Sequence, residues 1–266
     1  MVTIFTPTYN RAFTLERLYN SLIMQDSSNF EWLIVDDGSS DNSTELVEKW
    51  INEQLITINY ISTENGGKHR AINRGVKEAK GELFFIVDSD DYLTFDAIST
   101  IERKWSEIAF KYSYAGLCFR RINPKNGKII GAPFVKDGIS GSAITIHYLW
   151  KITQDKAEVF RTDIIKKFPF PEFENEKFVS EAIVWNKIAL STSHLLKCYN
   201  IGIYICQYQR DGLTLNFNRL VRNNPNGMIA YYSSLLKLKE ARIEPITLLK
   251  IAVRLCQSYF WKIVRF

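Results

Sequence analysis

The chain has 266 residues, of which 46% are hydrophobic, and it carries a formal net charge of +5. This length and composition can bury a sizeable core, which excludes an intrinsically disordered chain. The small positive charge excludes the strongly basic surface of a dedicated nucleic-acid-binding protein, so we expect no nucleic-acid partner.

The first half of the chain alternates between short apolar runs and helical patterns. Runs rich in β-branched or aromatic residues predict buried strands at residues 2–6, 31–35, 56–61 and 82–87. Apolar residues three and four positions apart predict helices at residues 14–23, 46–51 and 72–79. Thr14 is the expected N-cap of the first helix. The alternation predicts an α/β fold with a mainly parallel sheet and helices on both faces.

Polar segments follow each of these strands, with the sequences PTYN, DDGSSD, ENGGKH and DSDD. In open parallel sheets, ligands bind outside the carboxyl ends of the strands. We therefore expect a binding site at this edge of the sheet.

The second half has a less regular pattern. We expect further elements at about 95–110 (helix), 114–122 (strand), 180–190 (helix), 201–208 (strand) and from 215 onward (mainly helix). Residues 137–180 are expected to be rich in loops, because the prolines of FPFPEF interrupt helices. The prediction is one α/β domain over residues 1–214, followed by a mostly helical extension over residues 215–266.

Three acids close the fourth strand. Asp88 and Asp90 point the same way in an extended chain, and paired carboxylates suit a hard divalent cation such as Mg²⁺ or Mn²⁺. A cation would also offset the repulsion between these carboxylates. The alternative is a solvated turn in which an aspartate caps the next helix.

A second pair of acids, Asp36 and Asp37, follows the second strand. In a parallel sheet this pair opens on the same edge as the first, where it can hydrogen-bond a ribose or a base. Helix capping by Ser39, Asp41 or Ser43 is the alternative explanation of the loop, but it leaves Asp36 and Asp37 unexplained.

Basic residues follow the third strand. Gly66 and Gly67 allow a tight or positive-φ backbone, and Lys68 begins a helix, where unpaired N–H groups attract anions. Lys68 is therefore the predicted ligand contact, whereas His69 and Arg70 can equally lie on a solvated helix face. The spacing matches neither a P-loop nor a dinucleotide-binding GxGxxG.

Taken together, four segments in this order and spacing resemble the family 2 glycosyltransferases of the GT-A fold: TPTYNR (6–11), VDDGSSDNS (35–43), ENGGKHRAINRGVKEAKGE (64–82) and FIVDSDDYL (85–93). The resemblance is closest to bacterial enzymes that build capsular and other cell-surface polysaccharides. It implies inverting transfer of a sugar from a nucleotide-sugar, usually UDP-linked, with Mn²⁺ or Mg²⁺ as cofactor. The acceptor would be a glycan or a lipid-linked oligosaccharide. Residues 1–100 would bind the nucleotide-sugar, and residues 101–214 would form the acceptor side.

The resemblance also implies roles for single residues at these positions. Pro7, Thr8 and Tyr9 would line the nucleotide pocket, and Asp37 would contact the base with Asp36 beside it. Lys68 would lie near the base or the diphosphate. The family's DxD motif falls on DSD, with Asp88 near the ribose or diphosphate and Asp90 as the metal ligand, whereas Asp91 is an additional acid.

An inverting transfer needs a general base for the acceptor hydroxyl. By the resemblance this base is Glu181 in FVSEAIVW, although Ala182 stands where the family often has a second acid. Glu181 is also an ordinary residue for a first helical turn, where acids are stabilised by the helix dipole. The competing candidates are Asp155, Glu172, Glu174 and Glu176.

The segment QYQRDGLT (207–214) has the QxxR spacing of processive polysaccharide synthases. Asp211 replaces the tryptophan of that pattern, which argues against processive synthesis. Arg210 is a candidate contact of the donor diphosphate, and a salt bridge with Asp211 or another acid is the alternative.

Residues 246–266 predict an amphipathic helix with basic and apolar faces. One interpretation is peripheral contact with an anionic membrane, and the other is a helix packed on the domain with its basic face in water. The chain shows no apolar run long enough to span a membrane and no signal peptide, and its four cysteines are widely spaced. We therefore expect a cytoplasmic protein, with or without peripheral attachment to the inner face of the cell membrane.

Two other function classes stay open. A nucleotidyltransferase that forms sugar nucleotides also combines an α/β sheet with acids that hold Mg²⁺, but it favours a glycine-rich N-terminal loop that TPTYNRAF lacks. A catalytically silent nucleotide-sugar-binding protein would keep the pocket and lose the base.

Overall fold

The computed structural model describes residues 1–191, 194–207, 217–238 and 243–264. The strands are β1 (Val2–Thr8), β2 (Phe30–Asp36), β3 (Ile58–Ser62), β4 (Leu83–Ile86), β5 (Tyr92–Leu93), β6 (Tyr114–Ile122), β7 (Ile139–Gly141), β8 (Lys156–Arg161) and β9 (Leu195–Ile205). The α-helices are α1 (Ala12–Ile23), α2 (Ser43–Glu53), α3 (Lys68–Glu78), α4 (Ala97–Ser106), α5 (Thr162–Ile165), α6 (Ala182–Ser191), α7 (Phe217–Asn223), α8 (Pro225–Leu236) and α9 (Pro245–Val264). Two short turns complete the list, the 3₁₀ helix η1 (Lys111–Ser113) and the π-helix η2 (Thr145–Leu149).

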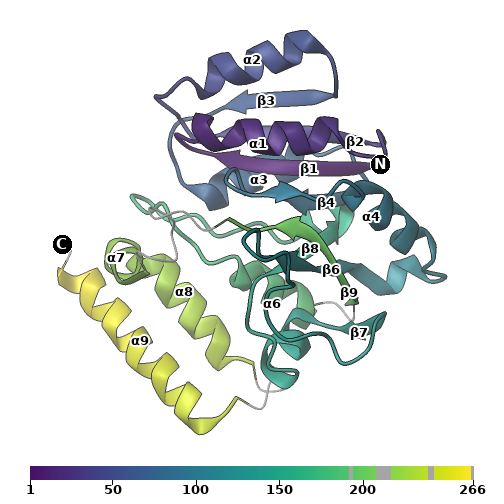
Figure 1. The fold of residues 1–266 in the computed structure, drawn as a ribbon. Coiled ribbons are helices and arrows are strands. Elements are labelled where there is room, and N and C mark those ends of the chain that lie inside the picture. The colour runs from purple at the N-terminus through teal and green to yellow at the C-terminus, as the bar shows by residue number, and fades with distance from the viewer. Residues whose placement is uncertain (192–193, 208–216, 239–242, 265–266) are drawn as a thin grey trace.

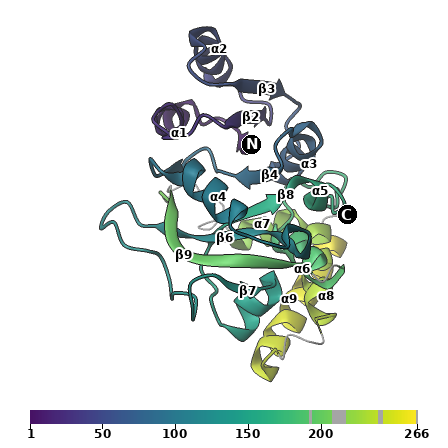
Figure 2. The same cartoon turned by 90° about the vertical axis from the view of Figure 1, so that its right-hand side faces the viewer.

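One sheet runs through the molecule in the order β3-β2-β1-β4-β8-β6-β9-β5, with β7 paired to β9. The first four strands are parallel, as the alternation of strands and helices predicts. Beyond β4 the sheet is mixed, because β8 runs antiparallel to both of its neighbours and β9 runs parallel to β6. Figures 1 and 2 show the parallel half at one end of the molecule and the C-terminal helices at the other.

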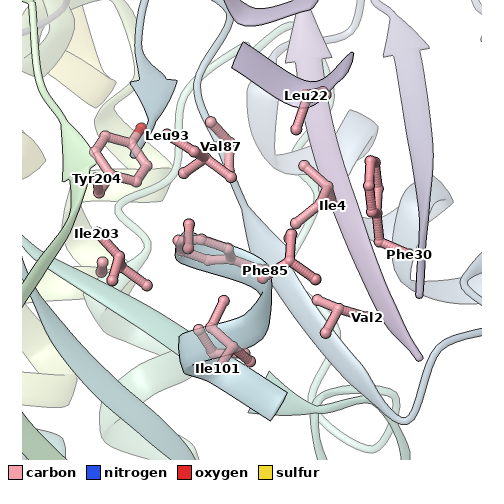
Figure 3. Close-up of a cluster of buried hydrophobic side chains, with 14 of the residues drawn as sticks. Val2, Ile4, Leu22, Phe30, Phe85, Val87, Leu93, Ile101, Ile203 and Tyr204 are labelled. Carbon is pink, nitrogen blue, oxygen red and sulfur yellow. The ribbon is translucent and has the colours of Figure 1, made fainter. Parts of the chain in front are cut away.

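The core lies in two layers, one on each face of the sheet. Alternation along β1 sends Val2 and Ile4 to the layer under α1, α2 and α4, and Phe5 to the layer under α3 and α6. Figure 3 shows part of the first layer, where Phe85 of β4 and Ile203 of β9 lie in one cluster. Residues from both halves of the sheet therefore share a core, and this core fixes the halves relative to each other.

The sequence patterns misplace several elements. Helix α1 begins at Ala12, and Thr14 lies inside its first turn, where its hydroxyl donates to the Arg11 carbonyl oxygen. Residues 137–180, expected to be rich in loops, contain β7, η2, β8 and α5. Strand β8 was missed because its sequence, KAEVFR, is half polar. Its polar side chains Lys156 and Glu158 face a cavity, whereas the alternate residues Ala157 and Val159 enter the core.

The described residues after 216 are mainly helical, as expected. Helices α7, α8 and α9 share an apolar cluster that includes Val221, Met228 and Ile251. Ile144, which comes from the α/β part of the chain, belongs to the same cluster. The predicted domain boundary at residue 214 falls in 208–216, outside the described residues. Within the part of the chain that is described, no helix has both the length and the apolar character needed to span a membrane.

Candidate active site

A cavity of about 1350 Å³ opens beyond the carboxyl ends of β1 and β4. The strand order reverses direction at these two strands, because β2 lies on one side of β1 and β4 on the other. Ligands bind at such a switch point in open α/β sheets. The cavity brings together eight of the predicted site residues, namely Pro7, Thr8, Tyr9, Asp37, Lys68, Asp88, Asp90 and Glu181. Asp36 is buried and does not line the cavity, and Arg210 lies outside the described residues.

Lys68 connects two acids that line the cavity, Asp88 and Glu181. Its Nζ lies 2.6 Å from Asp88 Oδ1 and 2.7 Å from Glu181 Oε1, and 29% of its side chain is exposed. Burial opposes the charge on Lys68, but the carboxylates of Asp88 and Glu181 hold its pKa above the ordinary value. Burial likewise opposes the charge on Asp88, but Lys68 and Arg121 hold the pKa of that carboxyl below its ordinary value. Both groups of the Lys68–Asp88 pair are therefore charged at neutral pH.

Asp91 has a structural environment that differs from that of the other two acids in DSDD. Its carboxylate accepts hydrogen bonds from Tyr204 Oη at 2.7 Å and from the Gln207 N–H at 2.6 Å. Arg121 Nη1 lies 3.6 Å away from the same carboxylate. Burial, together with the charge of Asp88, raises the pKa of Asp91 to about 7. Asp91 thus ties the end of β4 to the end of β9, and its bonds do not cap the following helix.

Asp90 and Asp88 form a donor set that fits a divalent cation. Within the described ranges, no three His, Cys, Asp or Glu side chains converge as a complete metal-ligand cluster. Mg²⁺ sites that serve nucleotides commonly use only one or two carboxylates, and the substrate phosphates and water complete the coordination. Burial and the charge of Asp88 raise the pKa of Asp90. A cation beside Asp90 would remove this electrostatic cost, so these two carboxylates suit a metal that arrives with a diphosphate.

Asp37 organises the loop before α3. Its two carboxylate oxygens accept the N–H groups of Gly66 and Gly67, both at 2.7 Å. Gly67 has a φ of +96°, and a Cβ at this position would lie 2.0 Å from the Lys177 carbonyl oxygen, so only glycine fits. Burial raises the pKa of Asp37 although these two N–H groups oppose the shift. Asp37 therefore both lines the cavity and fixes the backbone that presents Lys68.

Asp36 makes structural contacts beside this loop. Its Oδ1 accepts the Ser39 N–H at 2.7 Å, and its Oδ2 accepts the Tyr60 hydroxyl at 2.8 Å. The buried acid that helix capping could not explain from the sequence thus joins β2, its following loop and β3.

The fold places the five candidates for the general base in different environments. Glu181 immediately precedes α6 and lines the cavity together with Asp155. Glu176 accepts the N–H groups of Asn226 and Gly227, while Glu172 bonds Arg70 and Asn73. Neither Glu172 nor Glu176 lines the cavity, and neither does Glu174.

Arg17, which contacts the cavity wall, and several cavity residues carry no signal in the sequence. Arg17 donates to the Asp90 carbonyl oxygen and to Gln207 Oε1, and the Arg121 guanidinium lies 4.1 Å from the Tyr204 ring centroid. Trp185 of α6 and Tyr231 of α8 line the cavity. Each of these residues lies within a helix or strand and outside the polar segments that end the first four strands, so only the folded chain brings them to the site.

The sequence model described as "Glycosyl transferase family 2" matches residues 3–152, which is more than half of the chain. The chain belongs to glycosyltransferase family 2. The matched region holds the Asp88–Asp90 motif and Lys68, whereas Glu181 lies beyond it.

Several curated proteins are similar to this family 2 chain. The poly(ribitol-phosphate) β-N-acetylglucosaminyltransferase TarS of Staphylococcus aureus is 35% identical over 112 residues, which are 40% of this chain and 20% of TarS. Glycosyltransferase GlyA of Streptococcus pneumoniae is 35% identical over 39% of this chain and 15% of its own length. The GalNAc(5)-diNAcBac-PP-undecaprenol β-1,3-glucosyltransferase of Campylobacter jejuni is 23% identical over 97% of this chain and 80% of that enzyme. The chain thus spans about a fifth of the length of TarS.

Solved structures show the GT-A fold over almost the whole chain. Residues 1–349 of S. aureus TarS in complex with UDP-GlcNAc align with a TM-score of 0.66 at 22% identity, covering 97% of this chain and 72% of the other. The mannosyltransferase PcManGT of Pyrobaculum calidifontis, in complex with GDP-Man and Mn²⁺, aligns with a TM-score of 0.62 at 16% identity, covering 98% and 73%. At these identities the similarity establishes the fold, which includes the C-terminal helical region.

Proposed function

We propose that the protein is an inverting, metal-dependent glycosyltransferase that moves a sugar from a nucleotide-sugar to a glycan or lipid-linked acceptor. The observation that carries this proposal is the convergence of Asp88, Asp90 and Glu181 in one cavity, with Lys68 within 2.7 Å of both Asp88 and Glu181. A donor diphosphate near Asp88 and an acceptor hydroxyl near Glu181 would then occupy neighbouring parts of one site.

In this mechanism Glu181 is the general base. Its carboxylate accepts the proton of the acceptor hydroxyl as the hydroxyl oxygen attacks the anomeric carbon. The bond from that carbon to the diphosphate oxygen breaks on the opposite face of the sugar, so the configuration inverts and a nucleoside diphosphate leaves. Lys68 orients the Glu181 carboxylate and contributes positive charge on the diphosphate side of the cavity.

A divalent cation held by Asp90 and Asp88 would supply charge stabilisation for the departing diphosphate. Pro7, Thr8 and Tyr9 are the proposed walls of the nucleotide pocket, and Asp37 with Asp36 behind it is the proposed support for the base. Arg210 stays a proposed diphosphate contact. Membership of family 2 favours glycosyl transfer over nucleotidyl transfer, which was the alternative from the sequence.

The relatives support a substrate class. A TarS structure contains UDP-GlcNAc, and the relatives include a poly(ribitol-phosphate) β-N-acetylglucosaminyltransferase and a glucosyltransferase named for a PP-undecaprenol-linked substrate. We therefore propose a UDP-linked donor and an acceptor in bacterial surface polysaccharide synthesis.

Turnover of nucleotide-sugars tests the proposed function directly. The protein would be mixed with Mn²⁺ and a panel of UDP-, GDP- and dTDP-linked sugars, and release of nucleoside diphosphate would be measured with and without EDTA. We expect slow, EDTA-sensitive hydrolysis of at least one donor. Pyrophosphate formation from a nucleoside triphosphate would favour the nucleotidyltransferase instead, and tight binding without turnover would favour a silent binding protein.

Helix α9 supports peripheral contact with an anionic membrane as a further part of the proposal. The helix contains Lys250, Arg254 and Lys262 and no acidic residue. Its large exposed apolar side chains are Ile246, Leu248, Leu249, Val253, Tyr259, Phe260, Ile263 and Val264. Exposed apolar residues beside basic ones are typical of helices that lie in a lipid interface.

Vesicle sedimentation tests this part of the proposal. We expect the full chain to bind vesicles that contain phosphatidylglycerol and to bind pure phosphatidylcholine vesicles more weakly. The double variant Leu249→Ser, Phe260→Ser should lose this binding, because both side chains are exposed and their replacement leaves the core intact. Equal binding of the variant and the wild type would remove the membrane from the proposal.

A further inference from the structure

The segment that leads to the proposed base is fastened on two sides. Residues 172–178, called the base strap below, lie between the loop before α3 and the junction of α7 with α8. We propose that the C-terminal helices position Glu181 through this strap, with Glu176 and Asn224 as positioning residues. The inference rests on the proposed role of Glu181 as general base.

The C-terminal helices hold the strap through buried hydrogen bonds. Glu176 is only 2% exposed, and its two carboxylate oxygens accept the N–H groups of Asn226 and Gly227 at 2.8 Å each. These N–H groups belong to the first turn of α8, where the helix dipole also favours a negative charge. In return, Asn224 Oδ1 accepts the N–H groups of Lys177 at 2.8 Å and Phe178 at 3.0 Å. Glu176 of the strap and Asn224 before α8 therefore each accept backbone N–H groups from the other segment.

The donor side of the cavity holds the same strap. Arg70 of α3 donates to the carbonyl oxygens of Glu176 at 2.8 Å and Phe173 at 2.6 Å. The Lys177 carbonyl oxygen packs against Gly67, where a Cβ would approach to 2.0 Å. Because the strap is fixed on both sides, its position depends on the C-terminal helices as well as on the loop that presents Lys68.

The strap ends three residues before Glu181, whose Oε1 lies 2.7 Å from Lys68 Nζ. A general base acts only within hydrogen-bond reach of its proton, and a displacement of about 1 Å can cost roughly 10²-fold in rate. Loosening or pushing the strap should therefore reduce turnover and leave the nucleotide pocket at the ends of β1 and β2 intact. The start of α8, which lies in the predicted helical extension, would thus position the segment that leads to the proposed base.

Two substitutions perturb the strap in different ways. Gly227→Ala adds a methyl group 2.5 Å from the Phe178 carbonyl oxygen. Alanine is a better helix former than glycine, so a loss of kcat in this variant would come from the displaced strap and not from a weaker helix. Glu176→Gln keeps the size of the side chain but turns an amide NH₂ toward a backbone N–H. Leu235→Ala is the matched control, because Leu235 is buried at the far end of the same helix.

For both strap variants we expect kcat for sugar transfer or donor hydrolysis to fall by about 10- to 100-fold, with an unchanged Kd for the nucleoside diphosphate. Leu235→Ala should lower the melting temperature and keep kcat within about twofold of the wild type. Hydrogen exchange of the 177–181 amides should accelerate in Glu176→Gln and Gly227→Ala but not in Leu235→Ala.

The outcomes separate the inference from the proposed function. An active wild type whose strap variants keep full kcat would overturn the inference, as would equal losses of kcat in Leu235→Ala and the strap variants. A wild type that turns over no donor would overturn the proposed function. In that case hydrogen exchange still tests whether α8 holds the strap. Unchanged exchange of residues 177–181 in both strap variants would show that α8 does not hold this segment.

Discussion

Acidic side chains at the cavity are held in one way in the parallel half of the sheet and in another way where its two halves meet. In the parallel half, Asp37 is fixed by the backbone N–H groups of Gly66 and Gly67. Where the halves meet, Asp88 and Glu181 share the side chain of Lys68. Backbone amides cannot leave a carboxylate without a change in the loop, whereas a lysine on a flexible stem can exchange one anionic partner for another. The contacts of Asp37 are therefore suited to holding the loop in place. The contacts of Lys68 are suited to binding, because a ligand can replace one of its two carboxylate partners.

The largest expected effect is the loss of turnover on replacing Glu181, one of the two acids that share Lys68. Glu181→Gln should lower kcat by about 10²- to 10⁴-fold, because an amide cannot take the acceptor proton. Donor binding and melting temperature should stay near wild type, since 35% of the Glu181 side chain is exposed. Steady-state kinetics together with calorimetry of nucleoside diphosphate binding would measure both. Wild-type turnover in the variant would assign the base to another residue, with Asp155 next.

We expect Asp90 to bind the metal and Asp91, in the same motif, to have a structural role. Asp90→Ala should weaken Mn²⁺-dependent binding of the nucleoside diphosphate by about 10²-fold or more, because the proposed metal ligand is lost. Asp91→Ala should affect donor binding less and stability more, because it breaks the bonds to Tyr204 and Gln207. Titration calorimetry with and without Mn²⁺, beside thermal melts, separates the two effects. Equal effects on metal-dependent binding would show that the wrong acid of the pair was chosen.

Replacing Asp37 tests whether its contacts with the backbone stabilise the fold. Asp37→Asn should lower the free energy of unfolding by roughly 2 kcal/mol, because one of the two oxygens that accept the Gly66 and Gly67 N–H groups is replaced by an NH₂. Urea denaturation would measure the change, with Glu181→Gln as the comparison. A destabilisation no larger than that of Glu181→Gln would contradict the distinction between the two kinds of acid.

The smallest expected effect concerns His69 in the cavity wall. Its side chain is buried, and neither ring nitrogen has a hydrogen-bond partner among the described residues. Burial, aided by Arg70, lowers the pKa of His69 from 6.5 to about 4. The neutral ring therefore contributes stability that is present above pH 6.5 and is lost as the pH falls toward 4.

Replacing His69 with glutamine should remove this part of the pH dependence. Between pH 8 and pH 5, the wild type should lose roughly 1–2 kcal/mol more of its unfolding free energy than His69→Gln. Urea denaturation of both proteins at the two pH values would measure the difference. Parallel losses in the two proteins would show that His69 is not the group that titrates.

The fold of the first half could be predicted because its signals are local. Each strand is a mainly apolar run, and its polar end follows directly in the chain, so β1 to β4 and their helices were found with shifts of a few residues. The second half was harder because β8 alternates between core and cavity and β9 extends across a bulged pairing with β6. Patterns of this kind depend on which neighbour the strand finds, and a single segment does not contain that information.

By itself, the sequence determined the parallel half, the edge of the sheet that carries the polar residues, and the motifs DSD and NGGK. It did so because periodicity and strand ends are properties of consecutive residues. The tertiary structure decided which acids make structural contacts, since Asp36, Asp91, Glu172 and Glu176 find their partners tens of residues away. It also placed Glu181 against Lys68 and the base strap against α8. These contacts depend on how distant segments pack, so no local pattern could have specified them.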